Sequence, residues 1–265
     1  MSGPDVPIDA TICPVPNVNL FPSTLRVATW NIHKGVSGIG PTRRLQIHDI
    51  GHAVEQFDAD VICLQEVRSE HRREQRHFLR WPDQPQADFL APEGYEAAYR
   101  SNAVTRHGEH GNAVLSRWPV LQTRHRDVSD HRFEQRGLLH TLVQMQAAAV
   151  HVVVVHLGLI HAGRVRQIES IGRYLQREIP PQQALVVAGD FNDWGERLHR
   201  PMAELGLQTF DSVRLPTFPS RLPLLHLDRI YVRGLKPLSA HVPHGPIWWR
   251  MSDHLPLIAE FGFDP

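Results

Sequence analysis

The sequence predicts an α/β fold, and three observations support this prediction. The chain has 265 residues, which is enough for one large α/β domain. Short apolar runs bounded by turn residues recur along it, as expected of strands buried in a packed sheet. Between these runs lie segments whose apolar residues recur every three or four positions, which is the spacing of amphipathic helices.

Six of the apolar runs meet a polar, chemically capable residue at one end. Four runs end at such a residue: 25–31 at Asn31, 60–66 at Glu66, 150–156 at His156 and 184–190 at Asp190. Asn192 follows Asp190 two residues later. Asp228 lies at the start of run 227–232, and Asp253 and His254 precede run 255–261. Taken singly, an Asn or Glu after a strand is more often a turn or capping residue. Together they suggest a site, because catalytic groups commonly lie where strand ends meet loops.

Two segments have a clear helical pattern, 44–57 and 163–179. We expect the second to expose Arg164, Arg166, Arg173 and Arg177, as a solvated basic face or, alternatively, as a surface for an anionic partner. Residues 69–103 are charged and then rich in proline, which favours a helix followed by a long loop. Loops of that length are often functional.

Residues 1–23 contain five prolines and have no periodicity, so we expect an extended arm, with residues 24–265 forming a single domain. Cys13 and Cys63 are the two cysteines, and Cys63 lies in an apolar run typical of a buried strand. A disulfide framework is therefore not expected. The sequence also has no secretion-signal pattern and no apolar run of about 20 residues, so a cytoplasmic location is expected.

The charge balance argues against a large basic face for long duplex nucleic acid. Lys and Arg number 28 and Asp and Glu number 28, so the formal net charge is zero. The 18 histidines would make the protein distinctly cationic below about pH 6.

The polar residues at the strand ends suit phosphoryl-transfer chemistry. Oxygen donors of the kind that Mg²⁺ or Mn²⁺ prefers are present at five positions: Asn31, Glu66, Asp190, Asn192 and Asp253. A metal ion there would neutralise phosphate charge, and His156 and His254 would donate to phosphate oxygens or carry a proton. Asp228 would fix the tautomer of His254. Asp190, helped by Asn192, would orient or deprotonate the attacking water.

Competing chemistries lack their motifs. The sequence contains no Gly-x-Ser-x-Gly, no Gly-x-x-x-x-Gly-Lys-Ser/Thr and no His-Glu-x-x-His. Two cysteines do not provide a cysteine-based zinc centre.

Seven stretches in order resemble the endonuclease/exonuclease/phosphatase superfamily, which includes pancreatic-type DNases, exonuclease III-type repair nucleases, sphingomyelinases and inositol-polyphosphate 5-phosphatases. The stretches are Thr29-Trp-Asn31, Leu64-Gln-Glu66, Gly111-Asn-Ala-Val-Leu-Ser-Arg117, Val155-His156-Leu, Gly189-Asp-Phe-Asn192, Leu227-Asp-Arg-Ile-Tyr231 and Ser252-Asp-His254. Within the superfamily, the sequences of these motifs most resemble those of bacterial proteins of the YbhP type. The resemblance implies a four-layer α/β sandwich, with two mixed β-sheets face to face and helices outside.

The resemblance also implies roles for the site residues. Glu66 would be the principal metal ligand, with Asn31 and Asp253 near it. Asp190 and Asn192 would activate water, and His254 would contact phosphate with Asp228 as its partner. His156 occupies a position where exonuclease III-type enzymes carry Asn, whereas DNases and sphingomyelinases carry His.

Three further residues are candidates for the substrate region. The family's Gly-Asn segment implies that Asn112 is structural, near the floor of the site. Arg136 stands where some members keep a phosphate-contacting Arg, with a surface salt bridge as the alternative. Trp249, beside Trp248, either lines a substrate groove or packs against the sheet edge.

We therefore expect a Mg²⁺- or Mn²⁺-dependent phosphoesterase. The preferred hypothesis is a nuclease-like enzyme that hydrolyses small or single-stranded phosphodiesters. The alternative is a phospholipid or soluble phosphate-ester hydrolase. A catalytically inactive binding module on the same scaffold is a third hypothesis, which the chemical competence of every site position disfavours. The expected partner is a phosphate-ester substrate, nucleic acid or phospholipid among them, and the chain is expected to be a monomer without an obligate protein partner.

Overall fold

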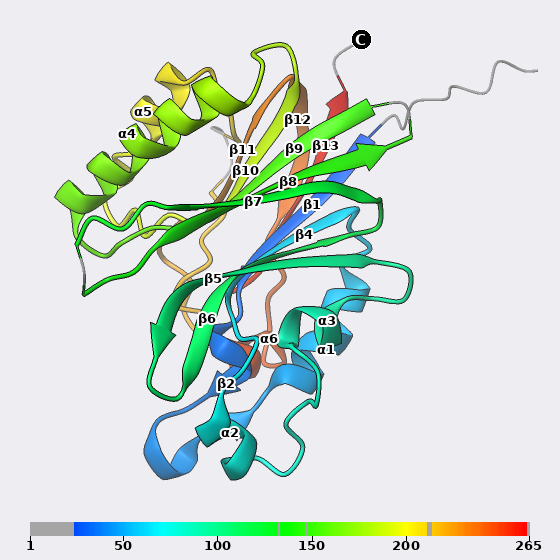
Figure 1. The fold of residues 1–265 in the computed structure, drawn as a ribbon, viewed down its shortest axis with the longest axis vertical. Helices are drawn as coiled ribbons and strands as arrows, with labels where there is room; N and C mark the ends of the chain where they lie inside the picture. Colours follow the sequence, from blue (N-terminus) through cyan, green and yellow to red (C-terminus); the bar gives the residue numbers. More distant parts are fainter. Residues whose placement is uncertain (1–23, 132, 147, 211–213, 264–265) are drawn as a thin grey trace, which may run out of the picture.

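The computed structural model describes residues 24–131, 133–146, 148–210 and 214–263, which form two large β-sheets with helices on their outer faces (Figure 1). The predicted α/β sandwich is confirmed. The arm expected over residues 1–23, including Cys13, lies outside the described residues.

The first large sheet has six strands in the order β12-β13-β1-β4-β6-β5. Strands β1 and β4 run parallel, and the other neighbours are antiparallel, so the sheet is mixed. Its strands are β1 (Thr24–Asn31), β4 (Val61–Val67), β5 (Glu96–Thr105), β6 (Gly108–Ser116), β12 (Leu235–His241) and β13 (Leu257–Phe263).

The second large sheet has five strands in the order β11-β10-β9-β8-β7. Strands β9 and β10 run parallel and the other neighbours are antiparallel. Its strands are β7 (Val120–Asp127), β8 (Gly137–Met145), β9 (Ala148–His156), β10 (Ala184–Asp190) and β11 (Asp228–Arg233).

Helices cover the outer faces of both sheets. Helices α1 (Ile47–Gln56), α3 (Gln86–Leu90) and α6 (Trp248–Met251) bury apolar residues against the six-stranded sheet. Helices α4 (His161–Glu178) and α5 (His199–Glu204) do the same on the five-stranded sheet. The remaining short elements are α2 (Arg72–His77), the 3-10 turns η1 (His33–Gly35) and η2 (Gly40–Thr42), and the small hairpin β2 (Val36–Ser37) and β3 (Arg44–Leu45).

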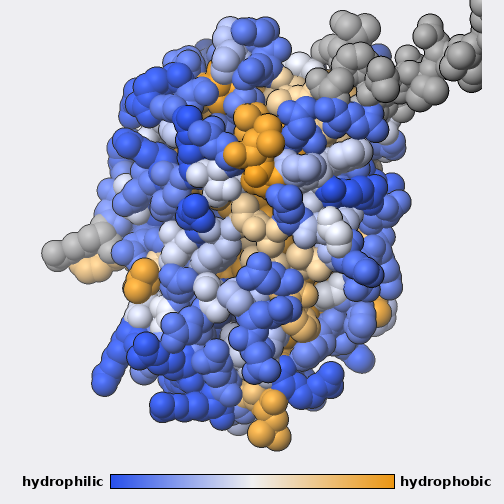
Figure 2. All heavy atoms as spheres, turned by 45° about the vertical axis from the view of Figure 1, so that its right-hand side comes forward, coloured by the Kyte–Doolittle hydropathy of each residue, from blue (hydrophilic) through white to orange (hydrophobic). Residues whose placement is uncertain are grey.

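A third apolar cluster fills the space between the two sheets and completes the four layers. It is built from alternate residues of strands in both sheets, and it includes the buried Cys63, as expected of a small hydrophobe. The face drawn in Figure 2 is mostly hydrophilic, with a few separate hydrophobic patches. Within the described ranges, no helix is long and apolar enough to cross a membrane.

Two expectations from the sequence were wrong. The loop expected within residues 69–103 contains α3, and β5 begins within it. Helix α3 has only five residues, too few for helical periodicity to be visible, although Ala87 and Leu90 are buried. Arg164 is not exposed on the predicted basic face: it is 3% exposed, and its Nη1 donates to the carbonyls of Gly158 and Leu159. The other three arginines of that face are exposed.

Candidate active site

The candidate site lies where the core between the sheets reaches the ends of the strands. On β9 and β10 the residues that face this core alternate, and each series ends in a polar side chain: Val154 is followed by His156, and Ala188 by Asp190. The strand register pairs Asp190 with His156 on one side and with Asp228 on the other. Three chemically capable side chains therefore form a row across neighbouring strands.

Asn31 brings the opposite sheet to this row. It continues the core-facing series of β1 after Leu25 and Val27, and it is only 3% exposed. Its Nδ2 donates a hydrogen bond to Oδ2 of Asp190 over 3.1 Å. The site is thus a junction between the two sheets, held by a buried polar contact.

Glu66 reaches the site through an irregularity in β4. In a regular strand, alternate side chains face opposite sides of the sheet, so Glu66 would face away from Cys63 and the core between the sheets. The register between β4 and β6, however, shifts between Leu64 and Val67. Glu66 has a φ of 57°, a left-handed conformation that is costly for a residue with a side chain. Such bulges are common next to active sites because they redirect a side chain.

The Glu66 carboxylate faces a cation. Nζ of Lys34 lies 2.9 Å from its Oε2, and the Glu66 side chain is only 16% exposed. Burial alone would raise the pKa of Glu66, but Lys34 and His156 outweigh it and hold this pKa well below its usual range. Glu66 is therefore ionised at neutral pH.

Asp190 is the centre of the site. Its Oδ2 lies 3.1 Å from Nδ2 of Asn31, 3.5 Å from Nε2 of His156 and 3.7 Å from Nε2 of His254. Its Oδ1 accepts the backbone N–H of Asn192 over 2.9 Å. Burial raises the pKa of Asp190, and the neighbouring histidines oppose that effect.

The two histidines beside Asp190 differ in protonation. Burial and the nearby charge of Arg136 lower the pKa of His156 to about 4. Burial would also lower the pKa of His254, but the carboxylates of Asp228 and Asp190 outweigh it and raise this pKa to about 10. At neutral pH the site therefore presents one neutral and one cationic imidazole.

Asp228 and a residue that the sequence did not indicate hold His254 in place. Nδ1 of His254 lies 2.7 Å from Oδ2 of Asp228, and Oγ1 of Thr217 donates to the same oxygen over 2.6 Å. The predicted pairing of Asp228 with His254 is thus present in the structure. Thr217 lies in a loop without a recognisable motif, so no pattern in the sequence singles it out.

Asp253 lies at the exposed rim of the site, with its side chain 47% exposed. Nδ1 of His33 approaches its Oδ1 to 3.2 Å. Burial tends to raise the pKa of Asp253, but His33 and His254 lower it below the ordinary value. His33 and Lys34, which lie two and three residues after Asn31 in the sequence, were not predicted as site residues. Their proximity to Asn31 was the available signal.

Asn112 and Asn192 stabilise the backbone around the site. Nδ2 of Asn112 donates to the carbonyls of Gly137 and Val154, which ties β6 to the opposite sheet. Nδ2 of Asn192 donates to the carbonyl of Leu157 over 2.9 Å. Asn112 thus makes the structural contacts that the family resemblance implied.

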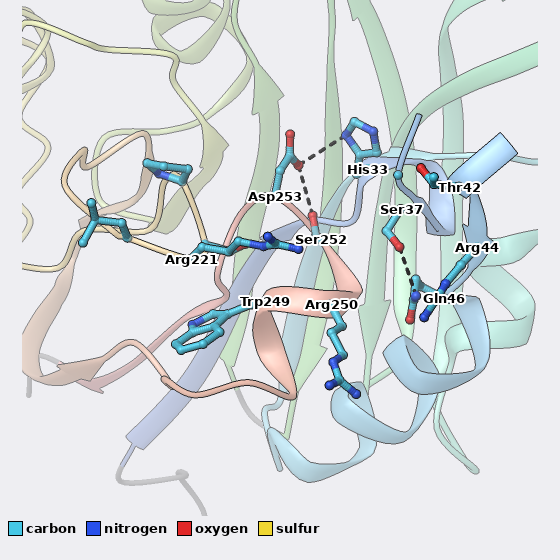
Figure 3. Close-up of a pocket in the computed structure, with 14 residues that line it drawn as sticks. His33, Ser37, Thr42, Arg44, Gln46, Arg221, Trp249, Arg250, Ser252 and Asp253 are labelled. Atoms are coloured by element: carbon cyan, nitrogen blue, oxygen red, sulfur yellow. Dashed lines mark hydrogen bonds and ion pairs between the residues drawn. The ribbon is translucent and has the colours of Figure 1, made fainter. Parts of the chain in front are cut away.

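Arg136 is held by an ion pair near the site, whereas Trp249 lines an adjoining cavity. Nη2 of Arg136 lies 3.1 Å from Oε1 of Glu134, so this arginine makes the salt bridge considered as the alternative, while its charge still acts on His156. Trp249 is 38% exposed and lines a cavity beside Asp253 (Figure 3). Trp248 instead stacks on Phe57, with ring centroids 6.2 Å apart.

Two groups of side chains offer ligands for a metal ion. The first group consists of the carboxylates of Glu66 and Asp253 and the side-chain oxygen of Asn31, which are hard oxygen donors. The ammonium of Lys34 already lies against Glu66, so this position attracts a cation. Asp190, Asp228 and His254 also offer ligand atoms within 4.8 Å of one another. In that second group, Oδ2 of Asp228 already accepts from both Thr217 and His254. The first group consists of oxygen donors alone, the type that Mg²⁺ and Mn²⁺ prefer, whereas Asp228 in the second group orients His254.

Comparisons with known proteins agree with the fold and show the family. The model of the endonuclease/exonuclease/phosphatase family matches residues 28–254. The uncharacterised protein YbhP of Escherichia coli (strain K12) is 40% identical over 248 residues, covering 89% of this chain and 96% of YbhP. The chain belongs to the endonuclease/exonuclease/phosphatase family.

Solved structures support the same fold at low sequence identity. An endonuclease/exonuclease/phosphatase from Bacteroides vulgatus superposes with a TM-score of 0.73 at 17% identity, covering 92% of this chain and 100% of that one. The human nocturnin catalytic domain with bound sulfate superposes with a TM-score of 0.67 at 19% identity, covering 91% and 94%. Members of the family are phosphoester hydrolases and generally use divalent metal ions.

Proposed function

We propose that this protein is a divalent-metal-dependent hydrolase of phosphodiesters, with Mg²⁺ or Mn²⁺ as its metal. The observation that carries the proposal is the environment of Asp190, whose Oδ2 is flanked by Asn31, His156 and His254. A buried carboxylate beside a neutral and a cationic imidazole supplies both a water-orienting group and donors for phosphate oxygens.

In this proposal each side chain has one task. Glu66, Asp253 and Asn31 hold the metal ion, which when bound neutralises phosphate charge and stabilises the leaving oxygen. Asp190 orients the attacking water and accepts its proton, while the Asn192 backbone N–H fixes the carboxylate. His254 donates to a non-bridging phosphate oxygen, and Asp228 keeps its ring charged and correctly turned. His156 donates as a neutral imidazole.

Small or single-stranded phosphodiesters are the proposed substrates. A formal net charge of zero gives little general attraction for a long duplex, whose binding depends on many phosphate contacts. The sulfate bound to the human nocturnin domain supports the proposal, because sulfate has the shape and charge of a phosphate group. A phospholipid or another phosphate ester is the alternative, favoured by the exposed Leu222 in the cavity beside the site and by the exposed Ile247.

A substrate panel with purified protein tests this proposal. Bis-(p-nitrophenyl) phosphate, p-nitrophenyl phosphate, single-stranded and duplex DNA, RNA and phospholipid vesicles are each incubated with Mg²⁺, Mn²⁺ or EDTA. We expect metal-dependent turnover that is faster on the diester than on the monoester, and faster on single strands than on duplex. Turnover that persists in EDTA, or none on any ester, would overturn the proposal; ligand binding without turnover would indicate an inactive binding module.

A further inference from the structure

A cavity of about 750 Å³ adjoins the candidate site on the side of Asp253 and His33 (Figure 3). Its wall is assembled from separate parts of the chain, namely the turn after β1, strand β3, residues 219–222 and helix α6. Pockets of this size typically hold a small molecule. The cavity therefore extends the site toward a part of the substrate that does not react.

Three arginines line this cavity. Arg44 comes from β3, Arg221 from the loop before β11, and Arg250 from α6. Their only acidic neighbour in the lining is Asp253, which is already in contact with His33. The cavity is therefore positively charged although the protein as a whole is neutral, and such a cleft concentrates anions.

The guanidinium groups of these arginines lack partners within the part of the chain that the structure describes. No hydrogen bond or ion pair from the Arg44, Arg221 or Arg250 side chain occurs there, and all three residues are exposed. Elsewhere the exposed Arg166 forms a two-point ion pair with Asp130, which is the usual arrangement for a surface arginine near a carboxylate. These three guanidinium groups line one cavity without a protein partner among the described residues, so they are available for a ligand.

From this arrangement we infer that the substrate carries a second anionic group, which binds to Arg44, Arg221 and Arg250 while the scissile phosphate lies at Asp190. Guanidinium groups recognise phosphate and carboxylate oxygens through paired hydrogen bonds. Trp249 adds an aromatic surface for a base, a ring or an apolar part between the two anions. This inference rests on the proposed function, and it narrows the substrate to small esters with two anionic groups, whether soluble or a lipid headgroup.

A matched pair of chromogenic esters tests the inference: thymidine 5′-(p-nitrophenyl phosphate) with and without a 3′-phosphate. We expect kcat/KM to be higher for the bisphosphorylated ester by about tenfold or more, the scale of one charge-assisted hydrogen bond. Arg221→Gln and Arg250→Gln should remove most of this preference, with a much smaller effect on the ester that has one phosphate. Arg173→Gln, a change at an exposed arginine of α4, is the control and should alter neither.

Binding without catalysis separates the failure of this inference from the failure of the proposed function. In EDTA, adenosine 3′,5′-bisphosphate should bind the wild type more tightly than adenosine 5′-phosphate does, and the triple Arg→Gln variant should lose that difference. Sedimentation with phosphatidylcholine vesicles that contain or lack phosphatidylinositol 4-phosphate, whose headgroup carries two phosphates, distinguishes the sources. Binding to anionic vesicles that the triple variant loses would indicate a lipid headgroup, and preference for the soluble bisphosphate alone would indicate a soluble ester.

Two results would overturn the inference. The first is equal affinity of the wild type for the two adenosine phosphates together with no selective binding to anionic vesicles. The second is an equal loss of kcat/KM on both esters in the arginine variants. Absence of turnover on either ester, with the bisphosphate preference retained, would instead contradict the proposed function and leave the second anion site supported.

Discussion

Nδ1 of His254 lies 2.7 Å from Oδ2 of Asp228, and both side chains are almost completely buried. This contact, together with the Asp190 carboxylate, keeps the imidazole of His254 charged at neutral pH. A permanently cationic donor at the centre of the site suits a substrate whose reacting group is an anion.

Replacing Asp228 by Asn removes the negative partner and should lower the pKa of His254 from about 10 by more than one unit. Turnover should fall by about 10- to 100-fold, the scale of a charged hydrogen bond. NMR titration of ¹⁵N-labelled histidine measures the pKa, and Asp83→Asn, at an exposed position, is the control. A His254 pKa that stays near 10 in Asp228→Asn would contradict the assignment.

Lys34 competes with a metal ion for Glu66, because its ammonium lies 2.9 Å from Oε2. Lys34→Met should therefore strengthen Mn²⁺ binding, by roughly fivefold for about 1 kcal/mol of relieved repulsion. Calorimetric titration measures the affinity, with Lys236→Met, on edge strand β12, as the control. Weaker Mn²⁺ binding in Lys34→Met would show that the lysine supports the site and does not compete.

A buried chain of histidines makes stability depend on pH. Nε2 of His140 lies 2.8 Å from Nδ1 of His151, and Nδ1 of His140 lies 2.8 Å from the Tyr174 hydroxyl. Burial and the neighbouring His151 lower the pKa of His140 to about 4, against 6.5 when unfolded. Between pH 4 and pH 6.5 the unfolded chain binds more protons at His140 than the folded chain does. The free energy of unfolding is therefore highest above pH 6.5 and decreases as the pH falls toward 4.

For His140 alone this loss is roughly 2 kcal/mol between pH 7 and pH 5. Urea unfolding at the two pH values measures it. His140→Phe should be less stable at pH 7 but should show a smaller difference between the two pH values. An undiminished difference in His140→Phe would contradict the assignment.

Gly189 precedes Asp190 at a point where two strands approach closely. It has a φ of +146°, and a Cβ there would lie 1.9 Å from the carbonyl oxygen of Val155. Gly189→Ala should therefore destabilise the fold by more than about 2 kcal/mol, because the β9–β10 pairing must move apart. Gly51→Ala is the control, since its Cβ would meet only side-chain atoms at 3.8 Å in the middle of α1.

Thermal unfolding of the two variants provides the comparison. Gly51→Ala should be neutral or slightly stabilising, because alanine favours a helix by up to about 1 kcal/mol over glycine. If Gly189→Ala melted together with the wild type, the close approach of the strands would not be a constraint.

The fold and much of the site could be predicted because strand alternation continues to the strand ends. The core-facing series of β9 and β10 place His156 and Asp190 on the inner face. In the sequence both strands are continuous apolar runs, which predict strands buried on both faces, and the polar residue that ends each run marks the site. The seven family stretches indicated both the sandwich and its polar edge.

The contacts that could not be predicted depend on irregular backbone. Glu66 faces the site only because β4 bulges, and Lys34 meets it from a turn with a φ of 63°. Thr217 reaches Asp228 from a loop, and the partners of Arg164 are backbone carbonyls. Neither periodicity nor spacing encodes such contacts.

We propose that Glu66 holds the metal ion on which phosphoester hydrolysis depends. The most direct measurement is Mg²⁺-dependent turnover of bis-(p-nitrophenyl) phosphate by the wild type, by Glu66→Gln and by Glu93→Gln, which makes the same change at an exposed carboxylate. We predict that Glu66→Gln abolishes turnover at every Mg²⁺ concentration while remaining folded, and that Glu93→Gln behaves like the wild type. Unchanged turnover by Glu66→Gln would show that Glu66 is not the metal ligand on which hydrolysis depends.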